Sequence, residues 1–372
     1  MKILYSCLSK SWGGMEMITL IFIKQLLKKN IKVEFLCLKE SRMHIEANNL
    51  GIILHPVKAA GYVNPLISIK LASIINHGSF DLIHAQASKD LWVIVPALKI
   101  LSSKIPLILT KHVGSFIVKK DWIHNFIYSR VTKAFAISSV IEKNLIETTS
   151  LTNDKIEVVF NGVDTKKFDP AKVDGNIVRK EFDVSDNEIL IGMLARLSPG
   201  KGHEEFIYAA DVLSKKYSNL KFIIVGEASR GEDKYAESVK TLAADKNLNN
   251  IIFTGFRNDT PNLLAALDIF VFPSHAEAFG LALIEAMAMG KPSVCSGSDG
   301  ILDIAVEGET SFLFKVKDAV DLTDKIELMI IDPGKRKIFG DNAIKRVKEK
   351  FELDVITGQT IKIYSQLLKS KV

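Results

Sequence analysis

Cysteine is scarce in this sequence, with three residues in 372, and no two of them stand at a C-x-x-C spacing. Zinc sites and disulfide frameworks are built from such pairs or from dense sets of cysteine, so the sequence argues against both and for a reducing compartment. We expect Cys7, Cys37 and Cys295 to be small, buried hydrophobic side chains.

Long uncharged runs are missing as well, because no stretch of 18 residues is free of charge. A membrane-spanning helix needs about 20 consecutive apolar residues. The chain also enters a predicted strand at residue 2, which leaves no signal peptide at its start. We expect a cytoplasmic protein, which a peripheral contact could hold at the inner face of the cell membrane.

Several signatures of nucleotide and nucleic-acid binding are absent. The chain has no Walker A sequence, zinc finger, RNP signature or long Lys/Arg run, and no internal repeat or low-complexity segment. These absences argue against a P-loop enzyme and against a nucleic-acid partner.

What the sequence has is an ordinary globular composition, 47% apolar and 25% charged, over a length that exceeds the usual single core. Two domains are therefore expected. The net charge of +6 is unevenly divided, because residues 1–170 carry +9 and residues 171–372 carry −3. A basic first half attracts anionic membranes, phosphorylated substrates or nucleic acid, of which the last is the weakest candidate.

Short apolar stretches alternate with amphipathic ones along the chain, which predicts strands and helices in turn. Strands separated by helices form parallel, doubly wound sheets, so we predict an α/β fold of two Rossmann-like halves. The predicted strands are 2–7, 32–38, 52–56, 82–84, 106–110, 134–137 and 156–160 in the first half, and 189–194, 222–225, 251–253, 269–272 and 293–295 in the second. The predicted helices include 15–29, 67–76, 91–101, 122–133, 140–148 and 355–368.

Two glutamates eight residues apart are the most informative pair in the chain. Glu277 and Glu285 follow the predicted strand 269–272, and a helix is expected to begin near Phe279. The first turn of a helix presents free N–H groups and a positive dipole end, which suit an anionic or hydroxyl-rich ligand. Gly280 would let that ligand approach the backbone closely. The alternative for the pair is an N-terminal charge with a solvated helix face.

Two cations and one histidine follow other predicted strands, at the edge where ligands of parallel α/β sheets bind. Arg196 and Lys201 flank a Ser-Pro-Gly turn, so both can reach a diphosphate, although solvated loop cations are the alternative. His112 follows the strand 106–110 and is expected to project into the same cleft. A lone histidine is more often an ordinary core or surface residue.

These segments resemble those of a known family, in the same order along the chain. Residues 277–292 resemble the E-x7-E signature of retaining nucleotide-sugar glycosyltransferases of family 4, which have the GT-B fold. Residues 196–202 resemble that family's diphosphate-binding segment, residues 161–168 its interdomain connection, and residues 13–16 its first loop. The resemblance covers nearly the whole chain.

The resemblance implies two Rossmann-like domains that face each other across a cleft. An acceptor-binding domain is expected over residues 1–165 and a nucleotide-sugar donor-binding domain over residues 166–352. A C-terminal helix over residues 353–372 is expected to return to the first domain. No D-x-D pair precedes the E-x7-E segment, and cations replace a metal at the diphosphate, so we expect no cofactor and no metal.

The resemblance also implies roles for single residues. In the expected catalytic set, Glu277 and His112 contact the transferred sugar, and Arg196 and Lys201 hold the diphosphate. Glu285 is expected to accept hydrogen bonds from the ribose hydroxyls. The remaining donor-binding residues implied by the resemblance are Gly14, Gly226, Phe256, Arg257, Phe279, Gly280 and Leu281.

Some aromatic and basic residues keep a second interpretation. Phe256 fits a core position as well as a base contact, and Arg257 fits the surface. Residues 119–133 mix aromatic and basic residues at helical spacing, as an interfacial helix would. Core packing is favoured for the apolar residues of this segment, while its lysines are left to face a membrane. Those apolar residues are Trp122, Ile123, Phe126 and Ile127.

The sequence therefore predicts a retaining glycosyltransferase that transfers a sugar from a UDP- or GDP-sugar to a cell-surface glycan or lipid-linked acceptor. Its partners would be that donor, that acceptor and an anionic membrane surface. The alternatives are another GT-B enzyme, such as a nucleotide-sugar epimerase or a sugar phosphorylase, and a sugar-nucleotide-binding subunit without turnover. The intact set of Arg196, Lys201, Glu277 and Glu285 argues against the last.

Overall fold

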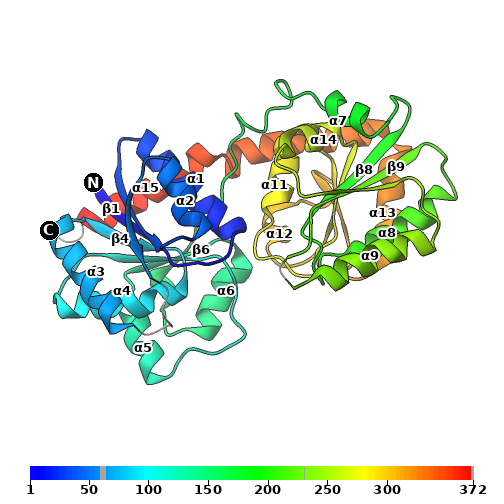
Figure 1. Ribbon diagram of the computed structural model, residues 1–372. Coiled ribbons are helices and arrows are strands. Elements are labelled where there is room, and N and C mark those ends of the chain that lie inside the picture. Colours follow the sequence, from blue (N-terminus) through cyan, green and yellow to red (C-terminus); the bar gives the residue numbers. More distant parts are fainter. Residues whose placement is uncertain (59–63, 230, 370–372) are drawn as a thin grey trace. The chain divides into compact units, whose positions relative to one another are not determined.

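The computed structural model describes residues 1–58, 64–229 and 231–369. The chain divides into two compact units, the first formed by Met1–Asn161 with Asp354–Val372 and the second by Gly162–Leu353 (Figure 1). The boundaries expected at 165/166 and 352/353 lie within a few residues of these. Each unit is a parallel sheet with helices on its faces, as the alternating pattern predicted.

The first unit is built on a seven-stranded sheet in the order β3-β2-β1-β4-β5-β6-β7, in which neighbouring strands are parallel. Its central strands are buried almost throughout, because helices cover both faces of such a sheet. The register places Tyr5 of β1 beside His84 of β4. The strands are β1 (Lys2–Cys7), β2 (Lys32–Leu38), β3 (Ile53–Val57), β4 (Leu82–Ala85), β5 (Leu107–Lys111), β6 (Lys133–Ala136) and β7 (Ile156–Val158).

Helices of the first unit begin where the sequence provides caps. Asn64 accepts a hydrogen bond from the Ile67 amide at the start of α3, and Asp121 accepts from the amides at the start of α5. The described helices are α1 (Gly14–Lys28), α2 (Arg42–Asn49), α3 (Pro65–Gly78), α4 (Leu91–Ile100), α5 (Trp122–Ser129), α6 (Ser139–Thr148) and α15 (Leu353–Lys369), with short 3-10 helices η1 (Ser88–Asp90) and η2 (Asn153–Lys155).

The C-terminal helix α15 packs on the first unit, beside α1 and β1 (Figure 1). Tyr364 of α15 shares a 2.8 Å hydrogen bond with Tyr5 of β1. Gln25 of α1 donates a hydrogen bond to the Asp354 carboxylate over 2.6 Å. Tyr364 is fully buried, so α15 supplies part of the core of this unit rather than lying on its surface.

The second unit is built on a six-stranded parallel sheet in the order β10-β9-β8-β11-β12-β13. Because β8 and β11 are hydrogen-bonded neighbours, the loops that follow them leave the sheet side by side. The strands are β8 (Ile189–Leu194), β9 (Leu220–Val225), β10 (Ile251–Gly255), β11 (Ile269–Phe272), β12 (Ser293–Ser296) and β13 (Ser311–Phe314). The helices are α7 (Asn176–Glu181), α8 (His203–Ser214), α9 (Asp233–Asp245), α10 (Thr260–Ala266), α11 (Leu281–Ala288), α12 (Ile301–Ile304), α13 (Ala319–Ile331) and α14 (Pro333–Lys350).

The predicted strands and helices are present, with ends that differ by a few residues. The largest shift is at α5, which ends at Ser129 because Lys133 already begins β6. β13 was not predicted. Cys7, Cys37 and Cys295 are free and fully buried, which confirms the sequence-based expectation.

The preference for core packing of the aromatic segment in α5 was wrong. Trp122 is 79% exposed, and Ile123 and Phe126 are also exposed, whereas Ile127 is buried. The helix is eight residues long, and it buries only Ile127 and Tyr128. Among the helices of the described residues, none combines the length and the apolar content needed to cross a membrane.

Candidate functional site

The loops after β8 and β11 bring two predicted site residues together. Lys201 Nζ donates a hydrogen bond to Glu277 Oε2 over 2.8 Å, although the residues are 76 positions apart in the chain. Their side chains are 22% and 21% exposed, so the ion pair is partly sheltered and still open to a ligand. The second oxygen of Glu277 has no partner among the described residues, which leaves it free to accept from a hydroxyl.

Close backbone packing holds these two loops against each other. Gly202 has φ +78°, and a Cβ at this position would lie 2.2 Å from the carbonyl oxygen of Pro273. The His275 amide also donates to the Gly200 carbonyl over 2.9 Å. A side chain at position 202 would therefore push the loops apart and separate Lys201 from Glu277.

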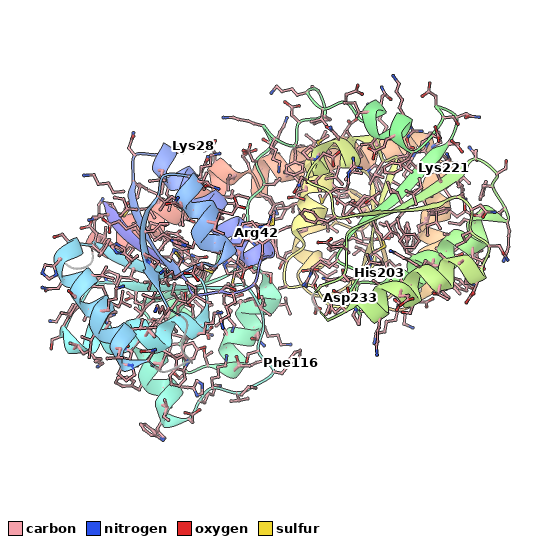
Figure 2. The ribbon with its side chains drawn as sticks, in the orientation of Figure 1. Lys28, Arg42, Phe116, His203, Lys221 and Asp233 are labelled. Atoms are coloured by element: carbon pink, nitrogen blue, oxygen red, sulfur yellow. The ribbon has the colours of Figure 1, made fainter. Side chains whose placement is uncertain are left out.

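A buried polar cluster adjoins the same loops and was missed by the sequence analysis. His275 Nε2 and Glu205 Oε1 are 2.7 Å apart. Glu205 Oε2, Ser274 Oγ and His203 Nε2 are buried and have no hydrogen-bond partner among the described residues. Burial lowers the pKa of His203, at the start of α8 (Figure 2), to about 4, so its imidazole is neutral at pH 7. Unpartnered buried polar atoms cost stability and tend to gather at functional sites.

The helix that carries Glu285 begins later than predicted. α11 starts at Leu281 rather than near Phe279, because Gly280 has φ +113°, which no residue of a right-handed helix adopts. The amide groups of its first turn, from Leu281 onward, face outward from the helix end. The Phe279 side chain is buried and packs edge-on against Phe351, with ring centroids 5.9 Å apart. A donor contact from Phe279 is therefore limited to its backbone.

Glu285 lies one turn into α11 and is half-buried. Its carboxylate has no hydrogen-bond or ion-pair partner within the described ranges. Burial raises the pKa of Glu285 to about 7, and the charge of Lys167 partly opposes that shift. Such a group can accept hydrogen bonds from two vicinal hydroxyls, and the predicted ribose contact stays a prediction.

Arg196 is exposed and turns toward the loop after β9. Its Nη1 donates to Ser229 Oγ over 2.8 Å, and Ser198 in the same loop donates to Glu232. No hydrogen bond joins Arg196 to Lys201 in the part of the chain that the structure describes. The two cations follow the same strand, as predicted, and their shared contact with a diphosphate stays a prediction.

The expected base-contacting loop has one exposed and one engaged side chain. Phe256 is 53% exposed, which rules out the core interpretation. Arg257 Nε and Nη2 donate to both oxygens of Asp259 over 2.9 and 2.8 Å, and Nη2 also reaches Glu181 of α7 over 2.8 Å. The Arg257 side chain therefore ties this loop to α7, which favours the surface interpretation.

Gly226 is required by packing in the same region. Its φ is +144°, and a Cβ would lie 1.9 Å from the Ala195 carbonyl oxygen. Its amide already donates to the Gly255 carbonyl over 3.0 Å. Both glycines border a cavity of about 420 Å³ between the ends of β8 to β10 and α9.

In the first unit, His112 is held at the end of β5. Its Nε2 lies 2.9 Å from Gln86 Oε1, which can only accept, so Nε2 carries the proton and Nδ1 is left as an acceptor. Burial lowers the pKa of His112 to about 4, which keeps the ring neutral at pH 7. Gly14 is the first residue of α1, and no side chain caps the amides of that turn.

A second buried histidine stands beside His112 and was not predicted. His84 Nδ1 lies 2.6 Å from Tyr364 Oη, and His84 Nε2 lies 2.7 Å from Thr110 Oγ1. Burial, with a smaller effect of His112, lowers the pKa of His84 to about 3. The network fixes the strand end that carries His112, and no sequence motif marks it because its members come from β4, β5 and α15.

No group of three or more His, Cys, Asp or Glu residues in the described ranges is arranged to hold a metal ion. Two cations, one free carboxylate oxygen and the amides of a helix end suit a phosphorylated, hydroxyl-rich ligand.

Two families match the chain, one for each half. Residues 12–167 match Glycosyltransferase Family 4, and residues 175–346 match Glycosyl transferases group 1. Two Rossmann-like units and these two matches identify a GT-B protein. The chain belongs to the family 4 type of GT-B glycosyltransferases and is an enzyme of that class.

Known relatives are similar in sequence and in structure. A Staphylococcus aureus capsular polysaccharide biosynthesis glycosyltransferase is 29% identical over 244 residues, which are 64% of this chain and 62% of that protein's length. A Campylobacter jejuni N,N'-diacetylbacillosaminyl-diphospho-undecaprenol alpha-1,3-N-acetylgalactosaminyltransferase is 26% identical over 86% of this chain and 87% of its own. The Anabaena protein HepE, solved in complex with UDP, has a TM-score of 0.87 and 25% identity, covering 98% of this chain and 100% of its own.

Proposed function

We propose that this enzyme is a retaining glycosyltransferase that moves a sugar from a nucleoside diphosphate donor to a lipid-linked or polysaccharide acceptor of the cell envelope. The observation that carries the proposal is the Lys201–Glu277 pair, held at 2.8 Å by the loops after β8 and β11. A cation for a phosphate and a carboxylate for sugar hydroxyls stand at one strand edge, next to the loop that leads into α11.

Each group has a part in the transfer. Lys201 and Arg196 neutralise the diphosphate as it leaves, and the amides at the start of α11 add donors for its oxygens. Glu277 accepts from sugar hydroxyls near the reacting carbon, where positive charge develops. Glu285 accepts from the ribose. The bond between the anomeric carbon and the diphosphate oxygen breaks as the acceptor oxygen bonds to that carbon on the same face.

The proton of the acceptor hydroxyl passes to the departing diphosphate in this scheme. No metal is needed for the charge balance, because the two cations and the helix amides meet the leaving group. We therefore propose that transfer continues in excess EDTA. Loss of transfer on chelation, restored by a divalent cation, would contradict this part of the proposal.

The donor class is proposed from the similarity to HepE, which was solved with UDP. A thermal-shift panel of UDP-, GDP- and ADP-sugars separates the possibilities, since a ligand at 100 times its Kd adds about 2.7 kcal/mol of stability. The proposed acceptor is a lipid diphosphate or a polysaccharide. The Campylobacter relative is a diphospho-undecaprenol glycosyltransferase, and the Staphylococcus relative is a glycosyltransferase of capsular polysaccharide biosynthesis.

The phosphate contacts are tested with Lys201→Ala and Arg196→Ala. Each substitution should weaken binding of the bare nucleoside diphosphate by about 1.5 to 3 kcal/mol, measured by calorimetry. Lys337→Ala, on an exposed part of α14 in the same unit, is the matched control and should bind normally. Unchanged affinity in both site variants, with the fold intact, would remove these residues from the site.

Stereochemistry tests the retaining reaction itself. The anomeric configuration of the first product, followed by NMR, should equal that of the donor. An inverted product would overturn the retaining mechanism while leaving the donor site in place. A requirement for inorganic phosphate as substrate would instead identify a phosphorylase.

A further inference from the structure

A cavity of about 400 Å³ in the first unit has a positively charged wall. It lies between the segment after β4, the segment after β5, and α5. Its lining includes lysine, serine, tyrosine and histidine but no carboxylate. The lining residues are Ser88, Lys89, Trp92, Ser115, Ile117, Lys119, His124, Ile127 and Tyr128.

A buried lysine stands directly behind this wall. Lys111, the last residue of β5, is 8% exposed, and its Nζ donates to Ser88 Oγ over 3.2 Å. Ser88 also hydrogen-bonds Tyr128 across the lining. No carboxylate pairs with Lys111 among the described residues. Burial lowers the pKa of Lys111 to about 8, and the charge of Lys119 adds to that shift.

Two more lysines line the cavity itself. Neither Lys89 nor Lys119 has an ion-pair partner in the part of the chain described. Burial also lowers the pKa of Lys119, which shows that its ammonium is partly withdrawn from water. The neighbouring acid Asp121 is already engaged by His124. An anion in the cavity would therefore meet two lysines that are in no ion pair, with the charge of Lys111 behind Ser88.

The same cavity opens beside an exposed apolar segment. Phe116, Ile117 and Val118 are 106%, 69% and 62% exposed, and Trp122 at the start of α5 is 79% exposed. Figure 2 shows Phe116 extending outward from the loop between β5 and α5. Four large apolar residues exposed in one short segment indicate contact with an apolar partner.

We propose that this cavity binds the diphosphate of a lipid-linked acceptor, with Lys119 and Lys89 at the phosphates, Lys111 behind Ser88, and the Phe116–Trp122 segment against the lipid chain. The inference rests on the proposed function and adds the place where the acceptor is held. A diphosphate is chosen over a phospholipid headgroup because several lysines match the several negative charges of a diphosphate better than the single negative charge of a headgroup.

The test uses farnesyl diphosphate, a short lipid diphosphate, and calorimetry with the full chain. It should bind at least about tenfold more tightly than either farnesol or inorganic diphosphate, because both parts of the site contribute. Lys111→Gln and, separately, Lys119→Gln should each weaken binding by about tenfold or more. Lys119→Gln changes a half-exposed residue, so it keeps the test usable if the buried variant does not fold.

Two controls separate this site from general charge and from the donor site. Lys143→Gln removes the same charge from α6, where the side chain is 74% exposed, and should leave binding unchanged. Phe116→Ser should weaken binding of farnesyl diphosphate but not of inorganic diphosphate. Saturating UDP should not displace the lipid, and Lys111→Gln should bind UDP as the unmodified protein does.

Three outcomes would overturn the proposal. Displacement of farnesyl diphosphate by UDP would place it in the donor site. If both lysine variants bound farnesyl diphosphate as tightly as the unmodified protein, the cavity would not be its binding site. Equally tight, Lys111-dependent binding of short-chain phosphatidylglycerol would replace the acceptor by a bilayer phospholipid. Failure of the proposed function looks different, because UDP binding would then be absent while the lipid diphosphate still bound.

Discussion

At the scale of single residues, the two glutamates of the E-x7-E segment differ in what surrounds them. Glu277 is paired with Lys201 and keeps one oxygen open. Glu285 has no partner among the described residues and a pKa raised by burial to about 7. We assign Glu277, which Lys201 already pairs, to the transferred sugar, where charge develops during the reaction. We assign the unpaired Glu285 to the ribose hydroxyls, which are bound both before and during the reaction.

This difference predicts separable kinetic effects. Glu285→Gln should mainly raise the donor KM and weaken nucleoside diphosphate binding, because the ribose is held before and during the reaction. Glu277→Gln should lower kcat by roughly 10² or more with little effect on binding of the bare diphosphate. Steady-state kinetics beside calorimetry measures both. The reverse pattern would exchange the two roles, and full activity in both variants would refute the site.

The raised pKa of Glu285 also predicts a pH effect on stability. The folded protein holds this proton up to about pH 7, whereas the unfolded chain releases it near 4.5. The folded state therefore binds more protons between these values, and its stability falls as pH rises through that window. The contribution is present in full below pH 4.5 and lost above 7, and it amounts to about 1 to 3 kcal/mol for a half-buried group.

Glu285→Gln removes the titrating carboxyl group and so isolates its contribution to the pH dependence of stability. The melting temperature of the variant should exceed that of the unmodified protein at pH 8 and match it near pH 4.5. Asp186→Asn, at an exposed position of the same unit, is the control for loss of a carboxyl group and should not raise the melting temperature at pH 8. Equal melting curves at pH 8 would mean that Glu285 is ionised without cost in the folded protein.

At the scale of elements, the site depends on two loops that approach more closely than side chains permit. The loop before α8 meets the loop after β11 at Gly202, where a Cβ would lie 2.2 Å from a backbone oxygen. Neighbouring strands β8 and β11 set the direction of these loops, and the glycine sets how closely they pack. The Lys201–Glu277 distance is a consequence of both.

Gly202→Ala should therefore cost more than a change of backbone preference alone. A left-handed alanine costs about 1 to 2 kcal/mol, and the clash with Pro273 should raise the loss of unfolding free energy above about 3 kcal/mol. Gly308→Ala is the matched control, since Gly308 has φ +73° and open space around its Cβ position. Chemical denaturation compares the two, and equal losses would show that loop contact contributes nothing.

At the scale of the whole molecule, charge and apolar exposure coincide in the first unit. Residues 1–170 carry +9, and the exposed residues Phe116 and Trp122 belong to the same part of the chain. A basic surface with projecting aromatic residues suits an anionic membrane interface. The second half, at −3, offers no such attraction.

Vesicle flotation tests this distribution. The protein should float with phosphatidylglycerol vesicles at low salt and lose binding as ionic strength rises, with each cation near the lipid contributing about 1 kcal/mol. Zwitterionic vesicles should bind weakly under the same conditions. Trp122→Ser should reduce the part of the binding that survives salt, since apolar contact is not screened. Absence of flotation at low salt would favour an acceptor that is not in a membrane.

The sequence by itself determined the layout of the protein. The alternation of apolar strands and amphipathic helices is a local signal, so it predicted the two parallel units. The resemblance of four segments, in order along the chain, to those of family 4 predicted the family, which the two family matches support. It also predicted that the cysteines are buried, because widely spaced cysteines without a C-x-x-C pair fit neither a disulfide framework nor a zinc site.

Tertiary structure alone decided the contacts between distant segments. The Lys201–Glu277 pair depends on strand neighbours, the His84–Tyr364 bond joins residues 280 positions apart, and the cavity beside Lys111 has walls from separate loops. The exposure of Trp122 reversed a prediction for the same reason: periodicity shows which residues share a helix face, and packing decides which face is covered. Such contacts leave no pattern in the local sequence, because each depends on where the rest of the chain has been placed.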